Sequence, residues 1–117
     1  MTRLCVVGPM RGYAHYNAPA FEAAASRLRA AGYEVVSPVE LDRAAGFCFE
    51  TDTATSEQVA AFQAAALREI DTADGLAMIE GWERSRGAAK EVEKARGLGL
   101  PFETVEAWVG LKERKGG

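Results

Sequence analysis

The sequence predicts an α/β protein whose parallel sheet is covered by helices on both faces. Short apolar runs recur at residues 4–7, 33–36 and 75–79, and each run ends at a glycine, proline or polar turn. Stretches with apolar residues at helical spacing separate these runs. Strands that alternate with helices form parallel sheets covered on both faces, because each crossover helix packs back onto the sheet.

The first helix is predicted between the first two strands. Asn17 suits the N-cap position, and Pro19 falls in the first turn, where its missing N–H does no harm. Gly32 occupies the position after the last turn that favours glycine. Apolar residues recur through this segment at 21, 24, 25, 28 and 31. The spacing therefore predicts one helix that packs its apolar face on the sheet.

The rest of the chain continues the alternation. An alanine-rich helix is predicted from Ser56 to Thr72, and another begins after Ser85 and ends near Gly97 or Gly99. Residues 101–105 predict a fourth, edge-like strand, and residues 106–117 predict a short final helix. Residues 39–56 show no clear periodicity. We expect them to form a long loop near the functional site that carries selectivity for part of the ligand.

Composition limits the classes of function. The chain has 117 residues, so we expect a single domain over 1–117. Its formal net charge of −3 gives no support for a nucleic-acid duplex or an anionic membrane as the partner. No apolar run approaches the length of a membrane span or a signal-peptide core. Two distant cysteines and a single histidine favour a reduced, cytoplasmic protein without a structural metal.

Two loops are predicted to meet at the carboxyl edge of the sheet, where parallel α/β proteins bind ligands. They read GPMRGY after the first strand and EGWERSRG after the third. Neither contains the GxxxxGK[ST] or GxGxxG pattern, so ATP, GTP and NAD binding of those kinds is disfavoured, and we expect no cofactor. Arg11 between glycines suits a phosphate clamp, although a solvated surface arginine fits the sequence as well. Tyr13, Tyr16 and Trp82 suit either stacking on a base or covering a helix.

The start of the helix predicted after Ser85 suits anion binding. Ser85 fits an N-cap, and Gly87 would let the backbone approach a phosphate at the helix N-terminus, although a plain capping serine is an equal alternative. Further along, Glu91 falls at the edge of the helix's apolar arc. A carboxylate drawn toward the protein body is paired, hydrogen-bonded or functional. Pairing with Lys94 or a nearby arginine is the structural alternative.

Four segments together resemble the nucleoside 2-deoxyribosyltransferase-like superfamily, which includes deoxynucleoside 5′-monophosphate N-glycosidases and a phage- and bacteria-associated branch. They are VVGPMRG with N-x-P-x-F, AAGYEVVSP, the Ala-Asp step at 73–74, and GWERSRGAAKE, the most specific of them. The resemblance covers residues 4 to about 105. It implies a flavodoxin-like three-layer α/β/α fold with a four- or five-stranded parallel sheet. It also implies a homodimer or larger homo-oligomer.

The resemblance implies roles for individual residues. Glu91 matches the family's nucleophile, which attacks the anomeric carbon of the sugar and displaces the base. Ser85 and Gly87 match positions that hold the 5′-phosphate in the monophosphate hydrolases. The loop that lines the sugar-phosphate is matched by Gly8, Met10, Arg11 and Gly12. Trp82 is a candidate contact for the base.

Two positions depart from the family pattern. Cys5 stands where the family has a tyrosine that orients the nucleophile, and Ala66 stands where it has an aspartate near the leaving base. Glu69 or Asp71 would replace that aspartate if the helix register shifted. Asp74 fits either a cap at the start of a strand or a residue of the crevice.

The sequence thus favours hydrolysis of the N-glycosidic bond of a (deoxy)nucleoside 5′-monophosphate. Two alternatives stay open. A nucleoside 2-deoxyribosyltransferase would exchange bases and needs no phosphate site, which the segment Ser85–Gly87 argues against. A nucleotide-binding protein without catalysis is favoured by Cys5 and Ala66.

Overall fold

The computed structural model describes residues 1–116, and the side chains of residues 1–112. Four strands form one parallel sheet in the order β2-β1-β3-β4. Their bounds are β1 Arg3–Val7, β2 Glu34–Val36, β3 Gly75–Met78 and β4 Phe102–Thr104. This confirms the predicted fold class with four strands, and the order is compatible with a flavodoxin-like sheet.

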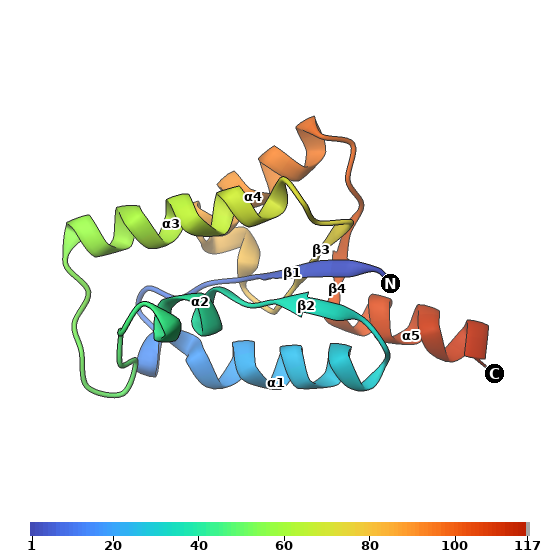
Figure 1. Ribbon diagram of the computed structural model, residues 1–117, viewed down its shortest axis with the longest axis horizontal. Helices are drawn as coiled ribbons and strands as arrows, with labels where there is room; N and C mark the ends of the chain where they lie inside the picture. Colours follow the sequence, from blue (N-terminus) through green and yellow to red (C-terminus); the bar gives the residue numbers. More distant parts are fainter. Residues whose placement is uncertain (117) are drawn as a thin grey trace.

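Helices cover both faces of the sheet, which gives three layers (Figure 1). On one face lie α1 (Ala18–Ala30) and α5 (Val105–Gly116), and on the other lie α3 (Ser56–Ile70) and α4 (Arg86–Gly97). A short helix, α2 (Pro38–Ala44), follows the carboxyl end of β2. None of the helices within residues 1–116 is long and apolar enough to cross a membrane.

The central strand β1 divides the core into two clusters. Leu4 and Val6 pack with Phe21 of α1, whereas Cys5 and Val7 pack with apolar side chains of α3 and α4. Successive side chains of a strand point to opposite faces, so a central parallel strand must be apolar on both. The short apolar run 4–7 therefore reads as continuous rather than alternating.

The prediction of a long loop over residues 39–56 is wrong at its start. Residues 38–44 form α2, which begins with Pro38 in its first turn and buries Val39 and Asp42. Seven residues span barely two helical turns, too few for an apolar period to appear in the sequence. Residues 45–55 have no regular helix or strand, as predicted.

Asn17 is the N-cap residue of α1, as predicted, but its side chain makes no capping hydrogen bond. His15, Tyr16 and Asn17 all have positive φ values, of 52°, 52° and 65°. Instead of capping, the Asn17 side-chain amide donates to the Pro9 carbonyl oxygen at 2.9 Å, and the Tyr16 hydroxyl accepts from the Ala54 amide at 3.0 Å. Left-handed conformations are strained for these residue types, so these bonds hold the turn and join residues 8–17 to the loop 45–55.

Candidate functional site

The loops after β1 and β3 meet at the carboxyl edge of the sheet, as predicted. Gly81, with φ of 90°, lies beneath the other loop: a Cβ there would come within 2.8 Å of the Tyr13 hydroxyl oxygen and 3.2 Å of Pro9 Cγ. It would also come within 3.3 Å of Arg84 Nη2. The hydrogen bond to Tyr13 is the first cause of the raised pKa of Arg84. The two loops, residues 8–13 and 80–87, therefore lie against each other, and we call them together the rim of the site.

The first loop contributes residues with different surroundings. Gly8 is buried, and a Cβ at this position would overlap the Ile79 side chain, so only glycine fits there. Met10 is half-buried against the α1-side cluster, whereas Arg11 and Gly12 are exposed. Gly12 has a φ of 85°, the left-handed region that favours glycine. Only the tip of this loop is open to a ligand.

Glu91 of α4 extends to the sheet rather than to solvent. Together with side chains of β1, β2, α2 and α3 it lines a cavity of about 10 Å³, room for roughly one water molecule. The other residues that line this cavity are Cys5, Val6, Val36, Pro38, Leu41, Ala66 and Glu69. The two positions that depart from the family pattern, Cys5 and Ala66, therefore lie directly beside Glu91.

The environment of Glu91 opposes its charge. Burial raises the pKa of the Glu91 carboxyl to about 7, and a hydrogen bond from Gln63 partly offsets this. The predicted alternative, an ion pair with Lys94, does not form: Lys94 Nζ lies 2.8 Å from Asp71 Oδ1 and donates to the Leu67 carbonyl. Glu91 therefore has a pKa of about 7, close to neutral pH, and it has no cationic partner among the described residues.

Gln63 of α3 contacts both Gly87 and Glu91 on α4, and it is not among the residues predicted from the sequence. Its Nε2 donates to Glu91 Oε1 and to the Gly87 carbonyl oxygen, each at 3.4 Å. A Cβ at Gly87 would overlap Gln63 Oε1, so the glycine makes room for this side chain. The single amide within AAFQAAAL was the available signal, but its partners come from 24 and 28 residues away.

The N-terminus of α4 is built as predicted. The Ser85 hydroxyl accepts from the Ala88 amide at 3.2 Å, which confirms the capping role. Helix geometry leaves the first N–H groups, those of Arg86 and Gly87, without intrahelical acceptors. Trp82, just before the cap, is half-buried and packs against the cluster under α4. This helix end therefore presents free N–H donors beside the rim of the two loops.

Four arginines within residues 1–112 form no ion pair; three of them lie at the same rim, and the fourth, Arg68, lies on α3. Within the described residues, Arg3, Arg27, Arg29, Arg43 and Arg96 each pair with a carboxylate. Arg11, Arg84 and Arg86 form no ion pair with the described carboxylates, and all three lie in the two rim segments. Glu80 and Glu83 lie in the same segments and act on Arg84, so three arginines against two glutamates leave a small local excess of positive charge on a protein of negative net charge.

The structure decides between the acids that the sequence left open. Glu69 lines the Glu91 cavity, and its Oε2 is held by Arg3 Nη2 at 2.9 Å. Asp71 is exposed and pairs with Lys94. Asp74 accepts from the Arg3 amide at 2.8 Å, where β1 and β3 begin, so it caps the amino edge and lies away from the crevice.

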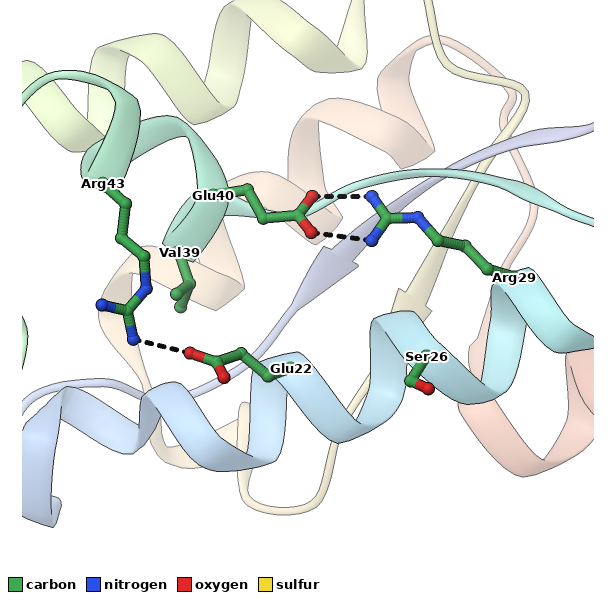
Figure 2. A pocket seen from close by; sticks show the side chains of 6 residues that line it. All are labelled: Glu22, Ser26, Arg29, Val39, Glu40 and Arg43. Atoms are coloured by element: carbon green, nitrogen blue, oxygen red, sulfur yellow. Dashed lines mark hydrogen bonds and ion pairs between the residues drawn. The ribbon is translucent and has the colours of Figure 1, made fainter.

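A larger groove of about 550 Å³ lies between α1 and α2, away from these loops (Figure 2). Its charged side chains are already paired: Arg29 binds both oxygens of Glu40 at 2.6 and 2.7 Å, and Arg43 binds Glu22 at 2.6 Å. Arg29 also donates to the Val35 carbonyl of the edge strand β2. This groove serves to protect a sheet edge rather than to bind an ion.

The raised pKa of Glu91 predicts a pH-dependent cost in stability. The carboxyl titrates at 4.5 when unfolded and about 7 when folded, so the native state loses stability as pH rises through this window. The slope is at most roughly 1.4 kcal/mol per pH unit. Glu91→Gln should therefore gain stability over the native protein between pH 5 and pH 8, measured by urea unfolding.

Glu93→Gln is the matched control for this measurement, since Glu93 lies on the same helix but is exposed. We expect it to change stability by less than about 0.5 kcal/mol at either pH. A Glu91→Gln difference that stays constant across pH would show that Glu91 titrates like an ordinary surface carboxyl.

Comparison with known proteins places the chain in a family. No curated protein matches the chain. A family model described as a domain of unknown function, DUF4406, matches residues 2–104. This range contains all four strands, both rim loops and the whole of α4. The chain therefore belongs to the DUF4406 family.

Proposed function

We propose that the protein hydrolyses the N-glycosidic bond of a (deoxy)nucleoside 5′-monophosphate, with Glu91 as the nucleophile. The observation that carries this proposal is the placement of Glu91 one helical turn after Gly87. Residues four apart share a face of a helix, so the carboxyl lies on the same face as the N-terminal turn of α4. Gln63 touches both positions, which fixes them relative to each other.

The chemistry suits a carboxyl in this environment. The ionised carboxylate attacks C1′ of the sugar, the C1′–N bond breaks, and the base leaves with the bonding electrons and takes up a proton. Water then attacks C1′, the ester bond to Glu91 breaks, and the carboxylate is regenerated with release of a proton. Covalent capture divides one hard step into two, and a desolvated carboxylate is a stronger partner for positive charge at C1′.

A 5′-phosphate would bind at the N-terminus of α4. The amides of the first turn and the positive end of the helix dipole attract anions. Arg11, Arg84 and Arg86 add positive charge at the rim, and none of the three pairs with a described carboxylate. A transferase that exchanges bases between nucleosides would have no use for this cationic rim, so we favour the monophosphate as substrate.

A second candidate, nucleotide binding without catalysis, is favoured by the cavity beside Glu91. Cys5 and Ala66 leave room for a water molecule there, and burial raises the pKa of the Cys5 thiol to about 12. A neutral thiol is a poor orienting group for a carboxylate. Gln63 is then the side chain that holds Glu91 in place.

Base release separates the two candidates. Purified protein incubated with ribo- and deoxynucleoside monophosphates and their parent nucleosides should release free base from at least one monophosphate, followed by chromatography. We expect kcat/KM to rise as pH increases through about 7, because the nucleophile must be ionised. Glu91→Gln should lower the rate at least roughly a thousandfold, since it removes the nucleophile.

Glu93→Gln should retain the native rate and shows that a neutral glutamine on α4 is tolerated. Wild-type rates in Glu91→Gln would refute the proposed nucleophile. No release from any compound, with a nucleotide still raising the melting temperature, would instead establish the binding protein.

The cationic rim gives a separate prediction about substrate. Arg86→Gln should raise KM for the monophosphate roughly tenfold and leave the parent nucleoside unaffected, because it removes charge next to the phosphate. Arg68→Gln, a change at an exposed arginine of α3, is the control and should change neither value. Equal effects on nucleotide and nucleoside would show that Arg86 does not bind phosphate.

We also propose that the protein works as a homo-oligomer through the first half of α3. This helix buries only Ile70, at its last position, whereas residues 59–61 and 64 are apolar and exposed. Sedimentation should show a dimer or larger assembly that Val59→Lys converts to monomer, since the lysine places a charge on this face. Leu98→Lys, at an exposed leucine directly after α4, should leave the assembly intact. A monomer at micromolar native protein would exclude the assembly.

A further inference from the structure

Asp42 is a buried carboxyl that the proposed chemistry does not use. Its side chain on α2 is only 3% exposed, yet it accepts none of the hydrogen bonds found among the described residues. Burial raises its pKa to about 7, with no charged partner as a cause. Among the described residues only Arg3 Nε and Ser37 Oγ are fully buried polar atoms without a partner, so the Asp42 oxygens keep a narrow contact with solvent. An acid so nearly buried and without a hydrogen-bond partner is costly, and this cost is a reason to look for a ligand or a function.

The turn of α2 aims Asp42 at the crevice. Successive residues turn by about 100°, so Asp42 lies about 40° from Pro38 and about 60° from Val39. Pro38 lines the Glu91 cavity, and Val39 packs in the cluster on the α1 face. Asp42 lies between these two directions on a helix that begins past the carboxyl end of β2 and contacts β1. It therefore points over the carboxyl end of β1, between the Glu91 cavity and the loop that follows that strand.

The surroundings of Asp42 suit a base rather than a phosphate. The Asp42 carbonyl accepts from the Phe47 amide at 3.0 Å, and Phe47 belongs to an aromatic group with Tyr16, Phe49 and Phe62. Phe47 and Phe49 are buried in the core, whereas Tyr16 and Phe62 are partly exposed and offer flat apolar surface to a heterocycle. A carboxylate repels phosphate, whereas it accepts hydrogen bonds from amino groups.

We propose that Asp42 is a specificity residue that accepts a hydrogen bond from an exocyclic amino group of the substrate base. This rests on the proposed function for the class of ligand. The proposal assigns base selectivity to α2, which would lie between the rim, where the phosphate binds, and the aromatic group. Adenine, guanine and cytosine carry such an amino group, whereas hypoxanthine, uracil and thymine lack it.

Binding to matched nucleotides tests the proposal. Glu91→Gln protein, used to prevent turnover, would be titrated by calorimetry with deoxyguanosine and deoxyinosine monophosphates. Two further pairs of monophosphates would follow. The first is deoxyadenosine with the deoxyriboside of unsubstituted purine, and the second is deoxycytidine with deoxyuridine. At least one amino-bearing nucleotide should bind about tenfold or more tightly than its partner, the effect of a hydrogen bond to a charged group.

Adding Asp42→Leu to the Glu91→Gln protein should reduce the affinity ratio within that pair to about threefold or less. Asp42→Asn should retain part of the ratio, because its side-chain carbonyl still accepts a hydrogen bond. The Asp42→Leu protein should melt at the same temperature or higher, since a buried carboxyl without a partner destabilises the free protein. A purely structural Asp42 predicts the opposite, a lower melting temperature.

Three outcomes would overturn the proposal: equal affinity within every pair, a ratio that Asp42→Leu leaves unchanged, or destabilisation by Asp42→Leu. Failure of base release by the native protein, with discrimination intact, would refute only the hydrolase. Absence of any nucleotide binding would refute both.

Discussion

Holding the carboxyl of Glu91 against the sheet lowers the stability of the folded protein, because the ionised carboxylate loses hydration. The surrounding residues must limit this loss. An acid at this position loses much of its hydration, and the raised pKa measures that loss. The Gln63 amide partly compensates, and Gly87 gives it the space to do so. The small side chains of Cys5 and Ala66 border a cavity beside the carboxyl that has room for about one water molecule. Gln63, Gly87, Cys5 and Ala66 thus together form the surroundings of one half-buried acid.

The topology explains why these residues meet. In the order β2-β1-β3-β4, the chain crosses from β2 to β3 through α3 and from β3 to β4 through α4, on the same face. The two helices are therefore neighbours above Cys5, and a side chain from each reaches the cavity. Phe62, next to Gln63, packs its ring edge-on against Phe47, so this contact helps to set the position of Gln63 on α3.

The sequence predicted most of the fold and the outline of the site, because both depend on local patterns. Apolar runs fixed the strands, and a serine at the start of α4 identified the cap that the structure confirms. The inward position of Glu91 followed from helical spacing. The residues that escaped prediction depend on distant partners: Gln63 contacts α4, Asn17 binds Pro9 in a left-handed turn, and Asp42 is buried by a helix too short to show a period.

The balance between catalysis and binding depends on how firmly Glu91 is oriented. Large rate enhancements need groups held in the reactive geometry before the substrate arrives. Here the carboxyl receives one hydrogen bond of 3.4 Å, longer than a typical charge-assisted bond. Glu69, which pairs with Arg3, lines the same cavity, and a water bound there would give Glu91 a second polar contact. An acid oriented through water retains the freedom to meet C1′, but it starts from a less restricted geometry. Such a site supports slow turnover more readily than fast chemistry.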